Sequence, residues 1–118
     1  MASVNLKTSV RSSNEQACII DIHGEITGFA ENVLMDAYTQ ASNNQPHTII
    51  INFSGLDYMN SSGIGLLVTI LIRAQRQKQQ LFAYGLNDHY KNIFKMTRLN
   101  EAIKIFENEQ DALAALLS

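Results

Sequence analysis

The sequence contains no tryptophan, one proline and one cysteine, and only 17% of its 118 residues are charged. The single cysteine, Cys18, excludes an internal disulfide, and its apolar strand context is typical of a small buried side chain in a reducing compartment. The most apolar stretch, residues 64–72, falls well short of the roughly 18 residues that a membrane-crossing helix needs. The first 16 residues contain no apolar run, so they do not form a secretory signal. We therefore expect a soluble cytoplasmic protein.

Neither sign of charge is in large excess, since the formal net charge is −2. The nine lysines and arginines are scattered, whereas non-specific nucleic-acid binding needs a basic stripe. The densest group is Arg73, Arg76 and Lys78, which we interpret as cations that complement the dipole at a helix C-terminus. The low charge predicts a surface that is in part apolar enough to meet a protein partner.

The residues of catalytic and cofactor sites are missing as well. The three histidines lie far apart in the sequence and show no metal-ligand spacing. Gly63 and Gly65 resemble the start of a dinucleotide fingerprint, but the third glycine is replaced by Val68. No Gly-Lys-Ser/Thr of a phosphate-binding loop and no Gly-x-Ser-x-Gly elbow occurs. We expect no metal, no cofactor and no enzymatic activity.

Hydrophobic periodicity predicts a single α/β domain over residues 1–118. After a first hairpin, closed by a turn at residues 12–14, strands alternate with helices, which predicts a mixed sheet of about five strands covered by about four helices. The first two strands are expected to form an antiparallel pair near a sheet edge. The predicted strands are 4–10, 18–24, 48–53, 81–85 and 104–106. The predicted helices are 27–41, 61–78 and 89–97, followed by a final helix that opens at residue 108 or 109.

The helix predicted at residues 61–78 has two apolar sides. The larger set occupies one face at helical spacing and is predicted to face the core; it comprises Ile64, Leu67, Val68, Leu71 and Ile72. Leu66, Ile70 and Arg73 lie on the opposite side. We predict that Leu66 and Ile70 form an exposed apolar pair, which is a natural docking patch.

A predicted turn at residues 56–59 leads into the segment from Asn60 to Gly65, which opens this helix. Asn60 and Ser61 are both good N-cap residues, and that ordinary role explains them. Gly63 and Gly65 lie inside the first turns, where each costs roughly 0.5–1 kcal/mol relative to alanine. Small residues at these positions leave the helix N-terminus bare, so that another protein or a phosphate group can approach the backbone.

These residues resemble the signature of the anti-sigma-factor antagonists, the stand-alone STAS domains, in which Asp-Ser-Ser/Thr-Gly-Leu/Ile-Gly follows a strand. Gly24-Glu25-Ile26 is similar to the family's Gly-Glu-Leu/Ile, and the segment 96–100 is similar to its Leu-Thr-Gly-Leu. The resemblance covers nearly the whole chain. The sequence departs from the family where Asn60 replaces the usual aspartate, where Thr27 replaces a frequent acid, and at Arg98 and Asn100.

The resemblance implies a STAS-like fold and a function as a partner switch. By this resemblance, the unphosphorylated protein is expected to bind a serine-kinase anti-sigma factor with a histidine-kinase-like ATPase fold. The kinase phosphorylates the first serine of the motif, Ser61, with Ser62 as a less favoured acceptor, and a PP2C-type phosphatase restores binding. We expect a monomer or weak dimer with a partner-binding surface around this serine. That predicted surface comprises Asn60, Ser62, Gly63, Gly65, Leu66, Ile70 and Arg73.

Two other functions remain open. In the first, the protein is a STAS scaffold whose serine is never phosphorylated, as a subunit of a stress-sensing or lipid-transport complex. In the second, it is a small nucleotide-binding domain, which the missing phosphate-binding loop disfavours. Size exclusion or native mass measurement distinguishes a scaffold, which belongs to a large complex, from a switch protein, which is small on its own. A rise in melting temperature on addition of ATP or GTP would indicate the nucleotide-binding function.

Overall fold

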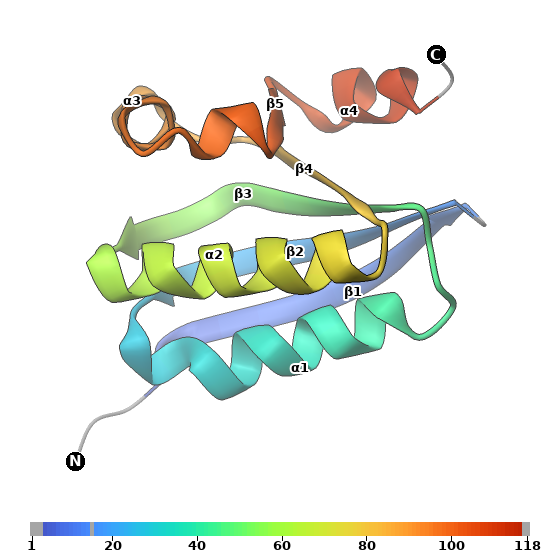
Figure 1. The fold of residues 1–118 in the computed structure, drawn as a ribbon. Coiled ribbons are helices and arrows are strands. Elements are labelled where there is room, and N and C mark those ends of the chain that lie inside the picture. Colours follow the sequence, from blue (N-terminus) through green and yellow to red (C-terminus); the bar gives the residue numbers. More distant parts are fainter. Residues whose placement is uncertain (1–3, 15, 117–118) are drawn as a thin grey trace.

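The structure is a computed structural model that describes residues 4–14 and 16–116 (Figure 1). Strands and helices follow one another in the predicted order. The strands are β1 (Leu6–Asn14), β2 (Ala17–Ile26), β3 (Thr48–Met59), β4 (Gln80–Tyr84) and β5 (Lys104–Phe106). The α-helices are α1 (Glu31–Ser42), α2 (Ser61–Arg76), α3 (Asp88–Met96) and α4 (Glu109–Ala115), and two short 3₁₀ helices are η1 (Gly28–Ala30) and η2 (Leu99–Glu101).

The five strands form one mixed sheet in the order β1-β2-β3-β4-β5. The pair β1–β2 is antiparallel and lies at the edge, as expected, and the other neighbours are parallel. Two predicted turns are wrong. Residues 12–14 belong to β1, because pairing with β2 continues to Asn14. Residues 56–59 belong to β3, because β2 pairs with that strand as far as Met59, with two register shifts on the way.

Helices cover both faces of the sheet. Figure 1 shows α1 and α2 side by side on one face, and the larger core cluster lies beneath them and includes Tyr90 and Phe94 of α3. On the other face, Ala112 of α4 packs in a smaller cluster with Ile50 and Phe82. The central run of β3, residues 49–51, is completely buried, which agrees with a parallel strand that has helices on both sides.

The buried face of α2 differs from the predicted one. Leu66 and Ile70, expected to be exposed, are buried, with 9% and 0% of their surfaces accessible, whereas Val68 and Ile72 are exposed. The reason is that Gly63 and Ala74 are small but buried, so the core side of the helix runs through them. The large side chains alone predict a core-facing side that is rotated about the helix axis by roughly a third of a turn from the observed one.

A polar network holds α4 to the strands on the second face of the sheet. Arg11 of β1 donates from Nε (2.6 Å) and Nη2 (2.9 Å) to the buried carboxylate of Asp21 in β2. Nη2 of the same guanidinium also donates to Glu109 of α4 over 2.7 Å. Ser9 and Asn52 donate further hydrogen bonds to Asp21. One arginine therefore joins the first strand to the last helix.

The same contacts shift the protonation equilibria of the network. Hydrogen bonds from Arg11 hold the pKa of Asp21 and the pKa of Glu109 below their usual values. Burial, together with the hydrogen bond that Tyr84 donates to Glu109, raises the pKa of Tyr84 to about 12. The folded state thus favours ionised carboxylates and a neutral tyrosine at this position.

Candidate functional site

The junction between β3 and α2 is fixed by two hydrogen bonds. The Met59 N–H donates to the hydroxyl of Tyr90 in α3 over 2.8 Å, which holds the end of β3 against the third helix. The Gly63 N–H donates to Oδ1 of Asn60 over 3.0 Å, so Asn60, one of the two candidate caps, is the N-cap of α2. The helix therefore begins at Ser61, and its axis starts where the paired strands β2 and β3 end.

Ser61 and Ser62 are exposed in the first turn of α2. The first N–H groups of any α-helix have no partner within the helix, and its N-terminus carries a partial positive charge. A phosphate group on a serine in this turn lies close to both, so each negative charge is tolerated or favoured by typically 0.3–1 kcal/mol. The position suits a hydroxyl that can be phosphorylated without unfolding the domain.

The two glycines of the motif have different physical roles. A Cβ atom on Gly63 would lie 2.1 Å from the carbonyl oxygen of Ile26, so this glycine lets α2 approach the end of β2. A Cβ atom on Gly65 would meet nothing within 4 Å. Gly63 is thus needed for packing, whereas Gly65 leaves a bare stretch of helix backbone at the surface.

The short helix η1 stands beside the serines. Thr27 caps it by accepting a hydrogen bond from the Phe29 N–H (3.3 Å), and the Cα of Gly28 faces the Cβ of Ser62. Phe29 is 66% exposed. The four-residue spacing of Phe29, Val33, Ala37 and Ala41 predicts an inward-facing Phe29 in the helix expected at 27–41, and this prediction is wrong. Thr27 caps η1, which begins at Gly28, and α1 begins only at Glu31.

One exposed face of α2 continues from the first serine. It comprises Ser61, Gly65, Val68 and Ile72, spaced by four, three and four residues, and is called here the α2 outer stripe. Val68 and Ile72 are 37% and 44% exposed. The predicted combination of an apolar pair and a hydroxyl cluster is therefore present, but other residues form it. Arg73 is exposed as well.

The departure at Arg98 has a conformational consequence. Arg98 has a φ of 62°, in the left-handed region that favours glycine, and it follows the C-terminal end of α3. This is the position at which the segment similar to Leu-Thr-Gly-Leu carries its glycine. The chain thus keeps the left-handed turn after α3 but forms it with a residue other than glycine, which strains the backbone there.

Residues 4–14 and 16–116 contain no group of three or more His, Cys, Asp or Glu side chains arranged to hold a metal ion. In the same part of the chain, no helix is long and apolar enough to cross a membrane.

Comparisons with known proteins identify the family and the fold of the chain. Residues 8–112 match the model of the STAS domain family. The chain is 21% identical over 108 residues to the anti-sigma-B factor antagonist of Staphylococcus aureus. The aligned region covers 92% of this chain and 97% of that protein.

Two solved structures of the anti-sigma factor antagonist SpoIIAA have the same fold. The unphosphorylated form superposes with a TM-score of 0.75 at 18% identity and covers 95% of this chain and 99% of the other. The phosphorylated form, described as a Bacillus cell fate determinant, gives a TM-score of 0.72 at 19% identity and covers 93% and 99%. These similarities establish the fold of the chain.

Proposed function

The chain belongs to the STAS domain family, and we propose that it is a non-catalytic anti-sigma factor antagonist whose binding to a serine-kinase anti-sigma factor is switched by phosphorylation of Ser61. The observation that carries the proposal is the exposed Ser61 hydroxyl at the N-terminus of α2, at one end of the α2 outer stripe. Relatives named anti-sigma-B factor antagonist, and a SpoIIAA structure in phosphorylated form, support the same function.

The docking surface combines the α2 outer stripe with Phe29 of η1. Val68, Ile72 and Phe29 supply exposed apolar area, and Gly65 lets a partner reach the helix backbone. Exposed apolar groups of this kind are typical of protein–protein contacts when they adjoin one another. Because Ser61 lies within this surface, a group added to its hydroxyl sits inside the contact with the kinase.

Phosphorylation then acts at the interface without a change of fold. A phosphoserine carries about −1.5 to −2 charges at neutral pH together with a hydration shell that must be removed on docking. A loss of about 2.7 kcal/mol at the interface weakens binding roughly a hundredfold. The helix N-terminus stabilises the same phosphate in the free protein. A PP2C-type phosphatase that removes it restores the docking surface.

The test compares Ser61→Ala with Ser61→Asp. Binding is measured by titration calorimetry against the serine kinases with histidine-kinase-like ATPase fold from the same organism. Ser61→Ala should bind its kinase whether or not ATP is present, whereas Ser61→Asp should bind at least about tenfold more weakly. Ser13→Asp, the same change at an exposed serine on β1, is the control and should leave the affinity unchanged. Equal affinities for the two Ser61 variants contradict the proposal and favour a scaffold whose serine is not modified.

A further inference from the structure

The outer edge of β1 presents unused backbone hydrogen-bonding groups. The Glu25 N–H donates to the carbonyl of Asn5 over 2.7 Å, which turns the backbone groups of residue 5 toward β2. In an antiparallel pair these groups alternate along the strand, and the β1–β2 register is regular from Leu6 to Ser12. The N–H and C=O groups of Leu6, Thr8 and Val10 therefore point away from β2. Among the described residues, no strand other than β2 pairs with β1.

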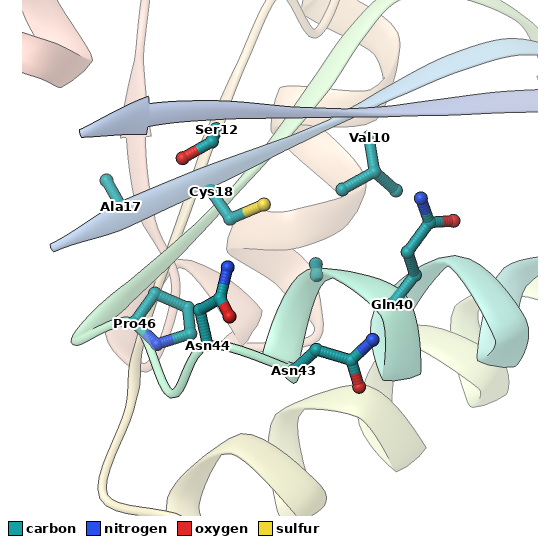
Figure 2. A pocket seen from close by; sticks show the side chains of 9 residues that line it. Val10, Ser12, Ala17, Cys18, Gln40, Asn43, Asn44 and Pro46 are labelled. Atoms are coloured by element: carbon teal, nitrogen blue, oxygen red, sulfur yellow. The ribbon is translucent and has the colours of Figure 1, made fainter. Parts of the chain in front are cut away.

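A groove of about 760 Å³ opens beside this edge (Figure 2). It lies between the end of the β1–β2 hairpin and the last turn of α1, and the residues that line it in the described part of the chain carry no charge. Figure 2 shows the sulfur of Cys18 pointing into it. Burial raises the pKa of this thiol, so Cys18 forms part of a neutral wall. The lining comprises Val10, Ser12, Ala17, Cys18, Gln40, Ala41, Asn43, Asn44 and Pro46.

An exposed apolar residue precedes the strand. Val4 is 49% exposed and lies two residues before Leu6, the first residue of β1. Side chains two residues apart on an extended strand point to the same face of the sheet. A continued β1 thus places Val4 on the face of Leu6 and Val10, which is the face that carries α1 and the groove.

We propose that two copies of this chain pair antiparallel through their β1 edges, with the twofold axis at Thr8. In this register the two Thr8 residues face each other, Leu6 faces Val10 of the second copy, and Lys7 faces Ser9. No two like charges stand directly opposite one another, and each facing pair of outward residues exchanges both backbone hydrogen bonds. The two sheets join into one continuous sheet.

The same register fills the groove. Val4 of each copy stands opposite Ser12 of the other, at the mouth of the groove lined by Val10, Ser12 and Cys18. An exposed apolar side chain then enters an uncharged groove, and the contact occurs twice because the interface is isologous. The self-complementary pattern of charges and backbone hydrogen bonds points to a second copy of this chain as the occupant.

The dimer leaves the proposed switch surface accessible. In Figure 1, α1 covers the sheet beside β1, whereas α2 lies on the far side of α1 from that edge. The α2 outer stripe of each copy therefore stays free, and a dimer presents two docking surfaces. This inference does not depend on phosphorylation of Ser61 or on the identity of the kinase.

Sedimentation equilibrium and native mass spectrometry of the full chain over a wide concentration range test the pairing. A concentration-dependent dimer is expected. Thr8→Pro removes only an outward-facing N–H, so it should abolish the dimer while circular dichroism reports an unchanged fold. Thr8→Val keeps the N–H and the side-chain shape, so it should dimerise like the wild type. Val4→Asp should raise the dissociation constant at least about tenfold, whereas Val68→Asp, a matched change on α2, should not.

A covalent trap gives a result that does not depend on the folding of the proline variant. Residues that face each other as a hydrogen-bonded antiparallel pair have Cα atoms about 5.5 Å apart, within the range that a disulfide spans. Thr8→Cys should therefore form a disulfide-linked dimer on mild oxidation, and Val68→Cys should not. A wild-type chain that stays monomeric at all concentrations overturns the proposal. A dimer that is unaffected by Val4→Asp and is not trapped by Thr8→Cys overturns it as well.

Discussion

Replacing either of the two glycines at the start of α2 by alanine should change the free energy of unfolding, and the two changes should have opposite signs. Gly63→Ala places a methyl group 2.1 Å from the Ile26 carbonyl oxygen and 2.9 Å from Cγ of Met59. Backbone cannot give way as a flexible side chain does, so either α2 or the end of β2 must shift. Gly65→Ala places its methyl group in open space.

The two magnitudes follow from separate physical terms. Alanine in place of glycine stabilises an exposed helix position by about 0.5–1 kcal/mol, because the unfolded chain loses conformational freedom. Overpacking a well-packed site costs typically 1–3 kcal/mol. Gly65→Ala should therefore raise the free energy of unfolding by about 0.5–1 kcal/mol. Gly63→Ala carries the same gain together with the overpacking cost and should lower the free energy of unfolding, which leaves a gap of roughly 1–3 kcal/mol between the variants.

Urea unfolding followed by circular dichroism measures both free energies under the same conditions. The two variants have the same composition and differ only in the position of one methyl group, so effects on the unfolded chain nearly cancel. If Gly63→Ala is as stable as Gly65→Ala, then α2 does not approach β2 as described. The placement of Ser61 in the first turn would then be wrong as well.

Three further predictions concern the cap, the left-handed turn and the polar network. Asn60→Ala should lower the free energy of unfolding by about 1 kcal/mol, whereas Asn60→Asp retains the cap and should change it by only a few tenths. Arg98→Gly should stabilise the fold by about 0.5–1 kcal/mol in urea unfolding, and Arg98→Ala should not, because only glycine relieves the positive φ. Because the pKa values of Asp21 and Glu109 are lowered in the folded state, their contribution to stability is present at neutral pH and is lost as the pH falls below about 5 through the lowered values. In urea unfolding, the free energy of unfolding should therefore fall less for Arg11→Met than for the wild type as the pH is lowered from 7 to a pH at which both carboxylates are protonated.

The order of elements and the mixed sheet were predictable because their signals are local. The β-branched run at residues 48–53 and the helical period after Ser61 each specify an element without reference to the rest of the chain. Residue type and position limit the N-cap of α2 to Asn60 or Ser61, and the hydrogen bond from the Gly63 N–H decides for Asn60. Strand ends were not predictable, because β3 continues to Met59 only through its pairing with β2.

The composition of the candidate surface was harder to predict. Sequence periodicity assigns the core side of a helix by its large side chains, whereas Gly63 and Ala74 are buried by the close approach of neighbouring elements. That approach is a tertiary property, and it rotates Ile70 into the core and Val68 toward solvent. Phe29 is exposed for a similar reason, since the chain forms η1 before α1 begins.

The central claim is that Ser61 carries a phosphate that controls partner binding. The most direct measurement is phosphosite mapping by intact mass and peptide sequencing, on protein isolated from its native cells under two growth conditions. The account predicts a single phosphate on Ser61 whose occupancy changes with the condition, with Ser62 unmodified. An unmodified Ser61 under conditions in which its serine kinase is active would contradict it.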